Sequence, residues 1–503
     1  MNALLPKVLA AAAAGLMLLA AAPAHAEDPD LVRTGAGLVR GSTTDGVRSF
    51  QGIPYAAPPT GDLRWRATEP ALPWEGVREA VEPGSPCARP GQEPGTVAGS
   101  EDCLFLNVHA PADAAEPLPV MVFLHGGGLS SGQGADYDPV RVVGHDVVVV
   151  TVNYRLGALG WLVHPDLDDP YAGNFGLADQ QAALAWVREE IGAFGGDAGN
   201  VTLWGQSAGG RSVCALLAAP GAEGLYDKAI VQSAPCGNAV VGVDEAQRHG
   251  LAHAESLGCT DDAEACLRSA DFSDLVALGG EEGLYRRAAD LPWSPVAGTE
   301  ALPLQPLTAM RRGLAAEVPL LHGGTSDEMR SMVLKAGPVT EERYPELVGE
   351  LFGERAVTPI IERYPVGDFE APAVALATLL TDYGGQLGIC SQPPALDAAS
   401  RHAPVYAYEF AEPAPPFGDF PLGAHHSADL GYFFDLPFPG WQRPEGDQAA
   451  LSEAMIGHWT AFAATGDPGW DEWRGKVLTL SVADTSMANL AAGHHCGFWR
   501  GFA

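Results

Sequence analysis

The feature that most constrains the fold of this 503-residue chain is the segment 204–210, Trp-Gly-Gln-Ser-Ala-Gly-Gly, which follows an apolar run typical of a strand. Glycines stand two residues before and two residues after Ser207, so a sharp strand-to-helix turn can pass very close to its neighbours. A helix that follows would point its free N–H groups at Ser207 and favour negative charge there. The pattern predicts a nucleophilic serine at the end of a strand, although a chain with 61 glycines can also match it by chance.

Short apolar runs alternate with helical patterns along the chain. Continuous apolar runs of this length are typical of strands buried on both faces of a mostly parallel sheet. The runs cover 120–124, 147–152, 201–204, 229–231, 318–321 and 405–408. Between two of them Leu177, Leu184, Val187 and Ile191 recur at helical spacing. The alternation predicts an α/β fold with right-handed crossovers. Residues 240–385 have more helical patterns and are expected to form a largely helical insertion that helps to roof the site.

The N-terminus has the pattern of a secretory signal peptide over residues 1–26. Lys7 is followed by an apolar run at 8–22 and by the cleavage pattern Ala24-His25-Ala26. The alternative is an uncleaved anchor. No second apolar span of about 20 residues occurs, so we expect no integral membrane segment once the leader is removed. Residues 27–503 are then expected to be secreted, extracellular or periplasmic, as a single catalytic domain.

The composition is strongly acidic, with 29 basic and 63 acidic residues and a net charge of −34. This charge argues against nucleic acid or an anionic membrane as a partner. A cationic substrate could be attracted, but solubility is the preferred explanation.

Eight cysteines in an exported chain permit disulfides. They lie at 87, 103, 214, 236, 259, 266, 390 and 496, and their spacing alone does not fix the pairing. Cys214 and Cys236 follow the serine turn and a strand, and we expect them to be buried free thiols.

A second glycine-rich segment, His125-Gly126-Gly127-Gly128, comes directly after the apolar run 120–124. Acyl transfer needs N–H donors aimed at a carbonyl oxygen as it becomes an oxyanion, and a glycine run exposes such donors. With the N–H of Ala208, this run predicts an oxyanion hole. The alternative is a tight turn without a catalytic role.

The other two members of a catalytic triad would follow Ser207 in the order acid, then histidine. Asp327 and Glu328 follow the run 318–321, and His425 and His426 lie on a later loop. Either acid can orient an imidazole, and either histidine can serve as the base. Chemistry alone therefore leaves both choices open, and a surface carboxylate or a structural histidine is the alternative for each.

Several further motifs resemble the type-B carboxylesterase/lipase family, which includes cholinesterases and bacterial para-nitrobenzyl esterases. The resemblance begins near Gly35 and extends to the C-terminus. It includes Glu-Asp-Cys-Leu-Phe-Leu-Asn at 101–107, similar to the family's second signature, and Cys-Gly-Phe-Trp at 496–499. Matching segments also occur at 50–56, 64–65, 153–157, 173–177, 194–197 and 465–468.

The resemblance implies an α/β-hydrolase fold and a Ser207, Glu328, His426 triad, with Gly127, Gly128 and Ala208 as the oxyanion hole. It also implies the disulfides Cys87–Cys103, Cys259–Cys266 and Cys390–Cys496, and the ion pairs Arg64–Glu101 and Arg155–Asp179. The implied activity is hydrolysis of a small-molecule ester through an acyl-enzyme, without a metal or organic cofactor.

Three departures from the family's pattern bear on the substrate. Gln206 stands where a glutamate is usual, Leu129 stands where an aromatic residue is common, and the segment between Cys87 and Cys103 has no tryptophan. These departures favour neutral esters over choline esters. The alternatives are a lipase or polyester-type hydrolase and, outside the enzymes, a cholinesterase-like binding protein.

Overall fold

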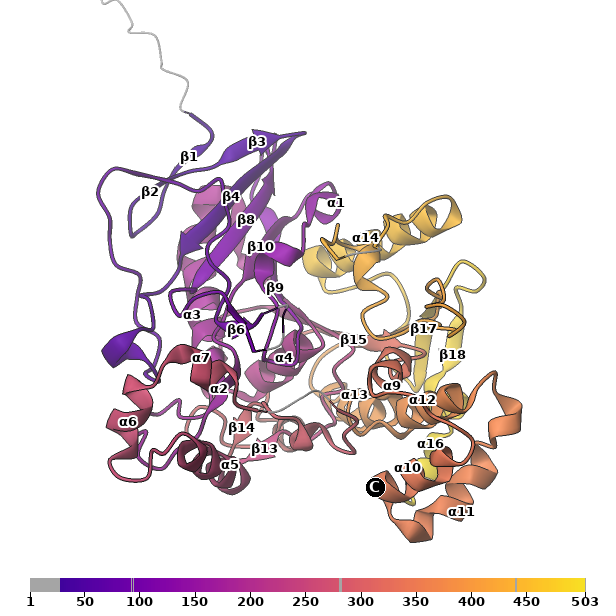
Figure 1. Cartoon of the computed structure of the whole chain (residues 1–503). Helices are drawn as coiled ribbons and strands as arrows, with labels where there is room; N and C mark the ends of the chain where they lie inside the picture. Colours follow the sequence, from indigo (N-terminus) through magenta and orange to yellow (C-terminus); the bar gives the residue numbers. More distant parts are fainter. Residues whose placement is uncertain (1–27, 92, 94, 280–282, 439–440, 503) are drawn as a thin grey trace, which may run out of the picture.

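The computed structural model describes residues 28–502 except 92, 94, 280–282 and 439–440, and the predicted leader at 1–26 lies outside these residues. A mixed eleven-stranded sheet forms its centre, in the order β18-β17-β16-β15-β12-β11-β9-β10-β8-β4-β3 (Figure 1). Its strands are β3 (Ser42–Thr44), β4 (Val47–Pro54), β8 (Phe105–Pro111), β9 (Leu118–Leu124), β10 (Val148–Val152), β11 (Gly196–Gln206), β12 (Lys228–Gln232), β15 (Leu320–Thr325), β16 (Val405–Phe410), β17 (Lys476–Leu480) and β18 (Met487–Asn489).

The strands from β17 to β10 run parallel, and antiparallel strands lie at both edges. All six predicted apolar runs fall wholly or partly in strands of the parallel part. The predicted α/β fold with a mostly parallel sheet is therefore confirmed.

Side chains of the central strands alternate between two hydrophobic layers. Val120 and Val122 of β9 pack in a cluster with residues of the helices α3, α4 and α13, whereas Met121 and Phe123 pack with residues of α1 and α14. Both faces of the sheet are thus covered, which explains why its strands are continuous apolar runs.

Helices occupy both the connections and the span 240–385. Their bounds are α1 (Val140–Val143), α2 (Gly157–Trp161), α3 (Phe175–Glu190), α4 (Ala208–Ala218), α5 (Val243–Ser256), α6 (Ala263–Ser269), α7 (Phe272–Val276), α8 (Pro306–Arg312), α9 (Arg330–Lys335), α10 (Arg343–Phe352), α11 (Glu354–Arg363), α12 (Pro372–Tyr383), α13 (Gln392–Ala399), α14 (Asp447–Thr465), α15 (Leu490–Gly493) and α16 (Cys496–Trp499). The span 240–385 holds α5 to α12, and the central strand β15 divides it into two helical parts. Figure 1 places α5 and α6 at one lower corner of the molecule and α10 and α11 at the other.

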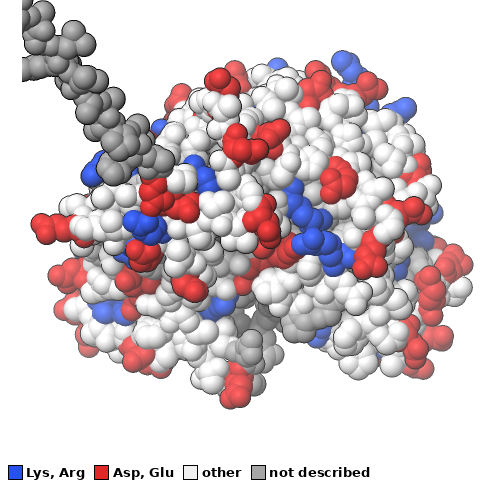
Figure 2. Space-filling view, turned by 90° about the horizontal axis from the view of Figure 1, so that it is seen from above, with Lys and Arg blue, Asp and Glu red and all other residues white. Residues whose placement is uncertain are grey.

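The minor sheets are short. They consist of β1 (Leu31–Arg33), β2 (Leu38–Arg40) and β5 (Val77–Glu79), of β6 (Arg89–Pro90) with β7 (Val97–Ala98), and of β13 (Val241–Gly242) with β14 (Val296–Ala297). None of the helices in the described ranges has the length and apolarity needed to span a membrane. Acidic side chains are spread over the face in Figure 2, with fewer basic ones between them.

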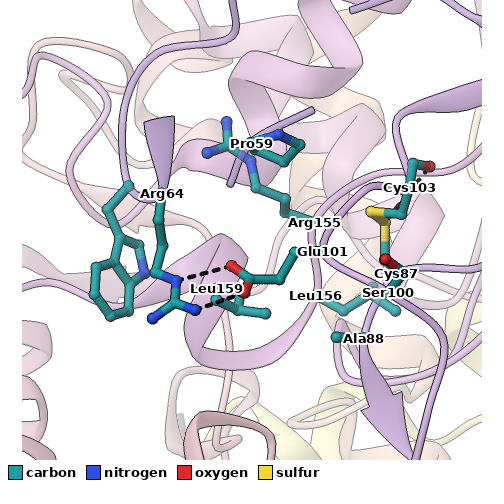
Figure 3. Close-up of a pocket in the computed structure, with 11 residues that line it drawn as sticks. Pro59, Arg64, Cys87, Ala88, Ser100, Glu101, Cys103, Arg155, Leu156 and Leu159 are labelled. Carbon is teal, nitrogen blue, oxygen red and sulfur yellow. Dashed lines mark hydrogen bonds and ion pairs between the residues drawn. A yellow bond between two sulfur atoms is a disulfide. The ribbon is translucent and has the colours of Figure 1, made fainter. Parts of the chain in front are cut away.

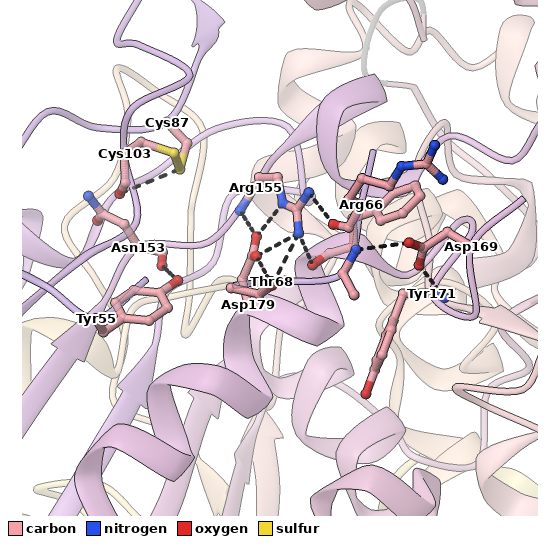
Figure 4. A network of polar contacts seen from close by, with 12 residues as sticks. Tyr55, Arg66, Thr68, Cys87, Cys103, Asn153, Arg155, Asp169, Tyr171 and Asp179 are labelled. Carbon is pink, nitrogen blue, oxygen red and sulfur yellow. Dashed lines mark hydrogen bonds and ion pairs between the residues drawn. A yellow bond between two sulfur atoms is a disulfide. The ribbon is translucent and has the colours of Figure 1, made fainter. Parts of the chain in front are cut away.

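Both implied ion pairs form; Arg155–Asp179 is buried, and Arg64–Glu101 is partly buried. Arg64 donates from Nε and Nη2 to the two carboxylate oxygens of Glu101, at 2.8 and 2.5 Å (Figure 3). Arg155 binds both oxygens of Asp179 at 2.8 Å, and Asp179 is fully buried (Figure 4). These bidentate pairs fix the loops before β8 and after β10, because such forks hold both partners in one geometry.

The structure contains four disulfides, and three of them join the pairs that the resemblance implies. The fourth joins Cys214 and Cys236, so the expectation of two free thiols is wrong. Both residues are buried as expected, but Cys214 lies on α4 and Cys236 on the loop after β12, and α4 packs against β12. This packing brings the two Cα atoms to 5.3 Å, within the range that a disulfide spans.

We predict that peptide mapping of the unreduced protein by mass spectrometry will recover the Cys214–Cys236 linkage together with the other three. Protein denatured without reductant is expected to react with no thiol reagent, because all eight cysteines are paired. Recovery of alkylated Cys214 and Cys236 peptides in good yield would contradict this pairing.

Candidate active site

Ser207 lies at the turn between β11 and α4, as the glycine spacing predicts. Its φ of 56° and ψ of −120° are rare for a residue with a side chain. A Cβ on Gly205 would lie 2.4 Å from the Gly209 carbonyl oxygen, and a Cβ on Gly209 would lie 1.9 Å from that of Leu124. Backbone contacts therefore require both glycines, and they hold the turn against the end of β9.

Ser207, His426 and Glu328 form one hydrogen-bonded chain. His426 Nε2 lies 2.8 Å from Ser207 Oγ, and His426 Nδ1 lies 2.6 Å from Glu328 Oε2. His426 is 6% exposed and Glu328 is fully buried. Such a geometry suits Nδ1–H donating to the carboxylate while Nε2 accepts the serine proton. The structure thus brings together loops that follow β11, β15 and β16.

The two neighbouring acids face different partners. The second oxygen of Glu328, Oε1, accepts a 2.8 Å hydrogen bond from the Thr325 amide. Asp327 instead accepts from the Ala424 amide at 3.0 Å and pairs with Arg330 at 2.7 Å. Asp327 therefore ties the acid loop to the histidine loop and does not contact the imidazole of His426.

His425 also differs from its neighbour. Its Nδ1 lies 2.8 Å from the His426 carbonyl oxygen, and burial lowers the pKa of His425. Neutral imidazole then donates from Nδ1 to that carbonyl and holds the loop backbone. His425 makes no hydrogen bond to Ser207 among the described residues.

Gln206 places an uncharged amide beside the imidazole of His426. Its Nε2 donates to Ser427 Oγ at 2.9 Å and lies 3.5 Å from His426 Nε2. Ser427 itself has a φ of 71°, so this hydrogen bond helps to hold a strained residue next to His426. The chain therefore has an amide where the family pattern has a carboxylate.

The glycine run lies directly against Ser207. A Cβ on Gly126 would lie 3.1 Å from Ser207 Cβ, and Gly127 and Gly128 both have positive φ. His125 before the run is buried and stacks on Tyr154 at 4.4 Å, and the Tyr154 hydroxyl donates to the His125 carbonyl oxygen at 2.6 Å. Burial lowers the pKa of His125 to about 4, so its ring is a neutral anchor for the run.

Backbone donors remain available beside the serine. Across the described part of the chain, no acceptor takes the amides of Gly127, Gly128 or Ala208. Ala208 is the first residue of α4, so its amide has no partner within the helix. Three N–H groups beside Ser207 are therefore free to donate to a bound group, as the predicted oxyanion hole requires.

Two buried groups near the triad are not identified by our sequence interpretation. Asp429, three residues after His426, is fully buried, and burial followed by the charge of Glu328 raises its pKa to about 6. Its Oδ2 accepts from Gln232 Nε2 at 2.7 Å. The other group is Arg211 on α4, whose signal is a lone cation in an otherwise apolar or small-residue helix. No group of three or more His, Cys, Asp or Glu residues in the described ranges is arranged to hold a metal ion.

Comparison with known proteins identifies the family. The model of the carboxylesterase family matches residues 28–499. The chain belongs to the carboxylesterase family. It is 34% identical to the para-nitrobenzyl esterase of Bacillus subtilis (strain 168), over 91% of this chain and 95% of that protein. It is 35% identical to the fumonisin B1 esterase of Sphingopyxis macrogoltabida, over 91% and 87%.

A solved PNB esterase structure superimposes with a TM-score of 0.80 at 31% identity, covering 94% of this chain and all of that one. The chain therefore has the α/β-hydrolase fold and is a carboxylic-ester hydrolase of this family.

The contacts of the two acids predict unequal effects of neutralising them. With Glu328 as the predicted triad acid, replacing it with Gln would remove the charge that stabilises an imidazolium at His426, and kcat should fall by roughly 10³–10⁴. Replacing Asp327 with Asn weakens its pair with Arg330 and should lower mainly the melting temperature. Both variants are measured with one chromogenic ester and by thermal unfolding, and a larger loss of kcat in Asp327→Asn would reverse our assignment.

Proposed function

We propose that this protein is a secreted serine carboxylesterase that hydrolyses small carboxylic esters through an acyl-enzyme, with Ser207 as nucleophile, His426 as base and Glu328 as acid. The observation that carries the proposal is the chain of 2.8 and 2.6 Å contacts through His426, beside three backbone N–H groups that have no acceptor in the described part of the chain. Family membership supports the ester as substrate class.

In the first half of the reaction, Ser207 Oγ attacks the ester carbonyl while His426 Nε2 takes its proton. The carbonyl oxygen becomes an oxyanion, which the N–H groups of Gly127, Gly128 and Ala208 stabilise. His426 then gives the proton to the leaving alcohol as the carbon–oxygen bond breaks. Glu328 holds the imidazole in its tautomer and stabilises its cation throughout.

In the second half, His426 takes a proton from water, and the hydroxide attacks the acyl-serine carbonyl. The tetrahedral intermediate collapses when His426 returns the proton to Ser207 Oγ, and the carboxylic acid leaves. Side chains and amides of the chain suffice for every step, so the proposed mechanism requires no metal or organic cofactor.

Secretion is proposed from two features. Four disulfides are typical of proteins in an oxidising compartment. The leader pattern at 1–26 predicts export to such a compartment. Residues 27–503 would then act as one catalytic domain, with the helical parts of 240–385 around the site entrance.

Two alternatives are separable by experiment. A lipase or polyester-type hydrolase would prefer long-chain or polymeric esters, which a series of esters of increasing chain length tests. A non-catalytic binding protein on the same fold would hydrolyse none of them, and the intact Ser207–His426 contact argues against it.

Replacing Ser207 with Ala should remove ester hydrolysis while leaving the fold unchanged. The expected loss in kcat is on the order of 10⁶, with a residual rate from the oxyanion donors. Burst kinetics with a chromogenic short-chain ester and circular dichroism test this. Near-normal turnover in a preparation free of the unmutated enzyme would contradict a serine mechanism.

A butyrate ester of a neutral alcohol should be hydrolysed with higher kcat/KM than butyrylcholine. A quaternary ammonium gains about 0.5–2 kcal/mol from each aromatic face it contacts. The segment between Cys87 and Cys103 has no tryptophan, and Gln206 offers no charge. The two esters are compared at similar leaving-group reactivity, and a clear preference for the choline ester would reveal an aromatic cage elsewhere.

A further inference from the structure

Arg211 is a buried cation without a partner among the described residues, one helical turn from Ser207, the proposed nucleophile. It is the fourth residue of α4, and its side chain is 9% exposed. Its Nη1 is buried without a hydrogen-bond acceptor, and no carboxylate of the described residues lies within ion-pair distance. Burial lowers the pKa of Arg211 only to about 10, so the guanidinium is charged at neutral pH.

Two other arginines of this chain that are buried, Arg64 and Arg155, have several hydrogen-bond partners. Arg64 makes five side-chain hydrogen bonds, two of them to Glu101. Arg155 makes five as well, two of them to Asp179. A buried charge ordinarily requires such partners, because desolvation of an unpaired ion is costly. Near a helix N-terminus, a cation is further opposed by the helix dipole. Arg211 therefore lacks the compensation that stabilises the other two.

Arg211 lines a small hollow that is partly open to solvent. Its walls include Cys214 of α4, Ala234 and Pro235 of the loop after β12, and the amide side chains of Asn238 and Gln386. None of the lining residues is acidic. The disulfide between Cys214 and Cys236 joins the two walls, one turn of α4 beyond Arg211. This covalent link ties α4 to the loop after β12 beside the hollow, which carries one positive charge without an ion-pair partner among the described residues.

The position of the hollow indicates which part of an ester substrate could reach Arg211. A long side chain at the fourth position of a helix extends back towards the helix N-terminus, which here is Ser207. The leaving alcohol must lie beside His426 to receive its proton, and no residue of the loop 423–430 lines the hollow. Ser207 and the glycine run do not line the hollow either, so an ester bound at Ser207 would reach Arg211 only through the far end of its acyl chain.

We propose that Arg211 is a specificity-determining residue that binds a carboxylate at the far end of the acyl chain, so that the preferred substrates are half-esters of dicarboxylic acids. A guanidinium binds a carboxylate through two parallel hydrogen bonds, which matches the missing partner of Arg211. This inference rests on the proposed esterase function and narrows its acyl substrate. Esters whose acyl chain ends in a carboxylate should then have a higher kcat/KM than esters with a neutral acyl chain. Neutral esters should in turn have a higher kcat/KM than choline esters, whose alcohol is cationic.

The test compares 4-nitrophenyl half-esters of succinate, glutarate and adipate with neutral 4-nitrophenyl esters of equal chain length. The unmutated enzyme should show higher kcat/KM for a half-ester at one or two chain lengths. In Arg211→Met the ratio of half-ester to neutral-ester kcat/KM should fall by about 30-fold or more, as when a buried charge pair loses one member. Arg211→Lys should give an intermediate ratio, because it keeps the charge but loses the two-pronged geometry.

Arg311→Met is the matched control. Arg311 is exposed on α8, so this variant removes the same charge from the chain without touching the hollow. The substrate ratio of Arg311→Met should equal that of the unmutated enzyme. An equal fall in both arginine variants would mean that net charge, and not a binding site, sets the ratio, and it would overturn the proposal.

Inhibition of the unmutated enzyme tests the proposal even if an Arg211 variant folds poorly, and the stability of a folded variant is a separate test. Free glutarate should inhibit the unmutated enzyme competitively, and glutaramide of the same length should not. The melting temperature of Arg211→Met should be above that of the unmutated enzyme, since the variant removes an unpaired buried charge. A preference for neutral esters at every chain length, with no inhibition by glutarate, would refute the carboxylate site. Absence of hydrolysis of every ester would instead refute the proposed function.

Discussion

The parallel alignment of the central strands is the constraint on which the site depends. Carboxyl ends of parallel strands meet at one edge of a sheet, and there the loops that follow them can converge. Pairing sets Gly205 opposite Leu124 and Gln232 opposite Gly323. Ser207 and His426 consequently meet across a sequence separation of 219 residues. A slip of one residue in any of these strands would turn its side chains to the other face and separate the loops.

Two buried carboxylates near His426, those of Glu328 and Asp429, differ in their hydrogen-bond partners. Glu328 accepts from His426 and from an amide, whereas Asp429 accepts from the uncharged Gln232. Burial and the charge of Glu328 raise the pKa of Asp429 to about 6. Since its pKa in the folded protein lies above the ordinary value, ionisation of Asp429 opposes folding. Its contribution to stability is therefore complete at low pH and is lost as the pH rises through about 6.

The sequence allowed the parallel sheet and the serine turn to be predicted from local patterns alone. Continuous apolar runs indicate strands that are buried on both faces of a sheet, and the spacing of the two glycines around Ser207 indicates a turn whose backbone passes close to its neighbours. The choice of Glu328 over Asp327 needed the family resemblance, because both acids follow the same strand and only their contacts distinguish them. The bond between Cys214 and Cys236 could not be predicted from spacing. It depends on how α4 packs on β12, which brings together residues that look like ordinary core thiols.

The packing of α4 against β12 also buries Arg211 beside the loop that follows β12. A surface that is acidic overall repels anions at long range, but salt screens this field within about 8–10 Å under ordinary conditions. A buried guanidinium acts on a nearby group through a lower effective dielectric than that of bulk water and outweighs distant charges. The enzyme would therefore discriminate in favour of a carboxylate only once the substrate is bound. This discrimination would depend on the position of the carboxylate relative to Arg211 more than on the net charge of the protein. A carboxylate held there would also compensate the buried cation, so that substrate binding would restore the pairing that folding leaves incomplete.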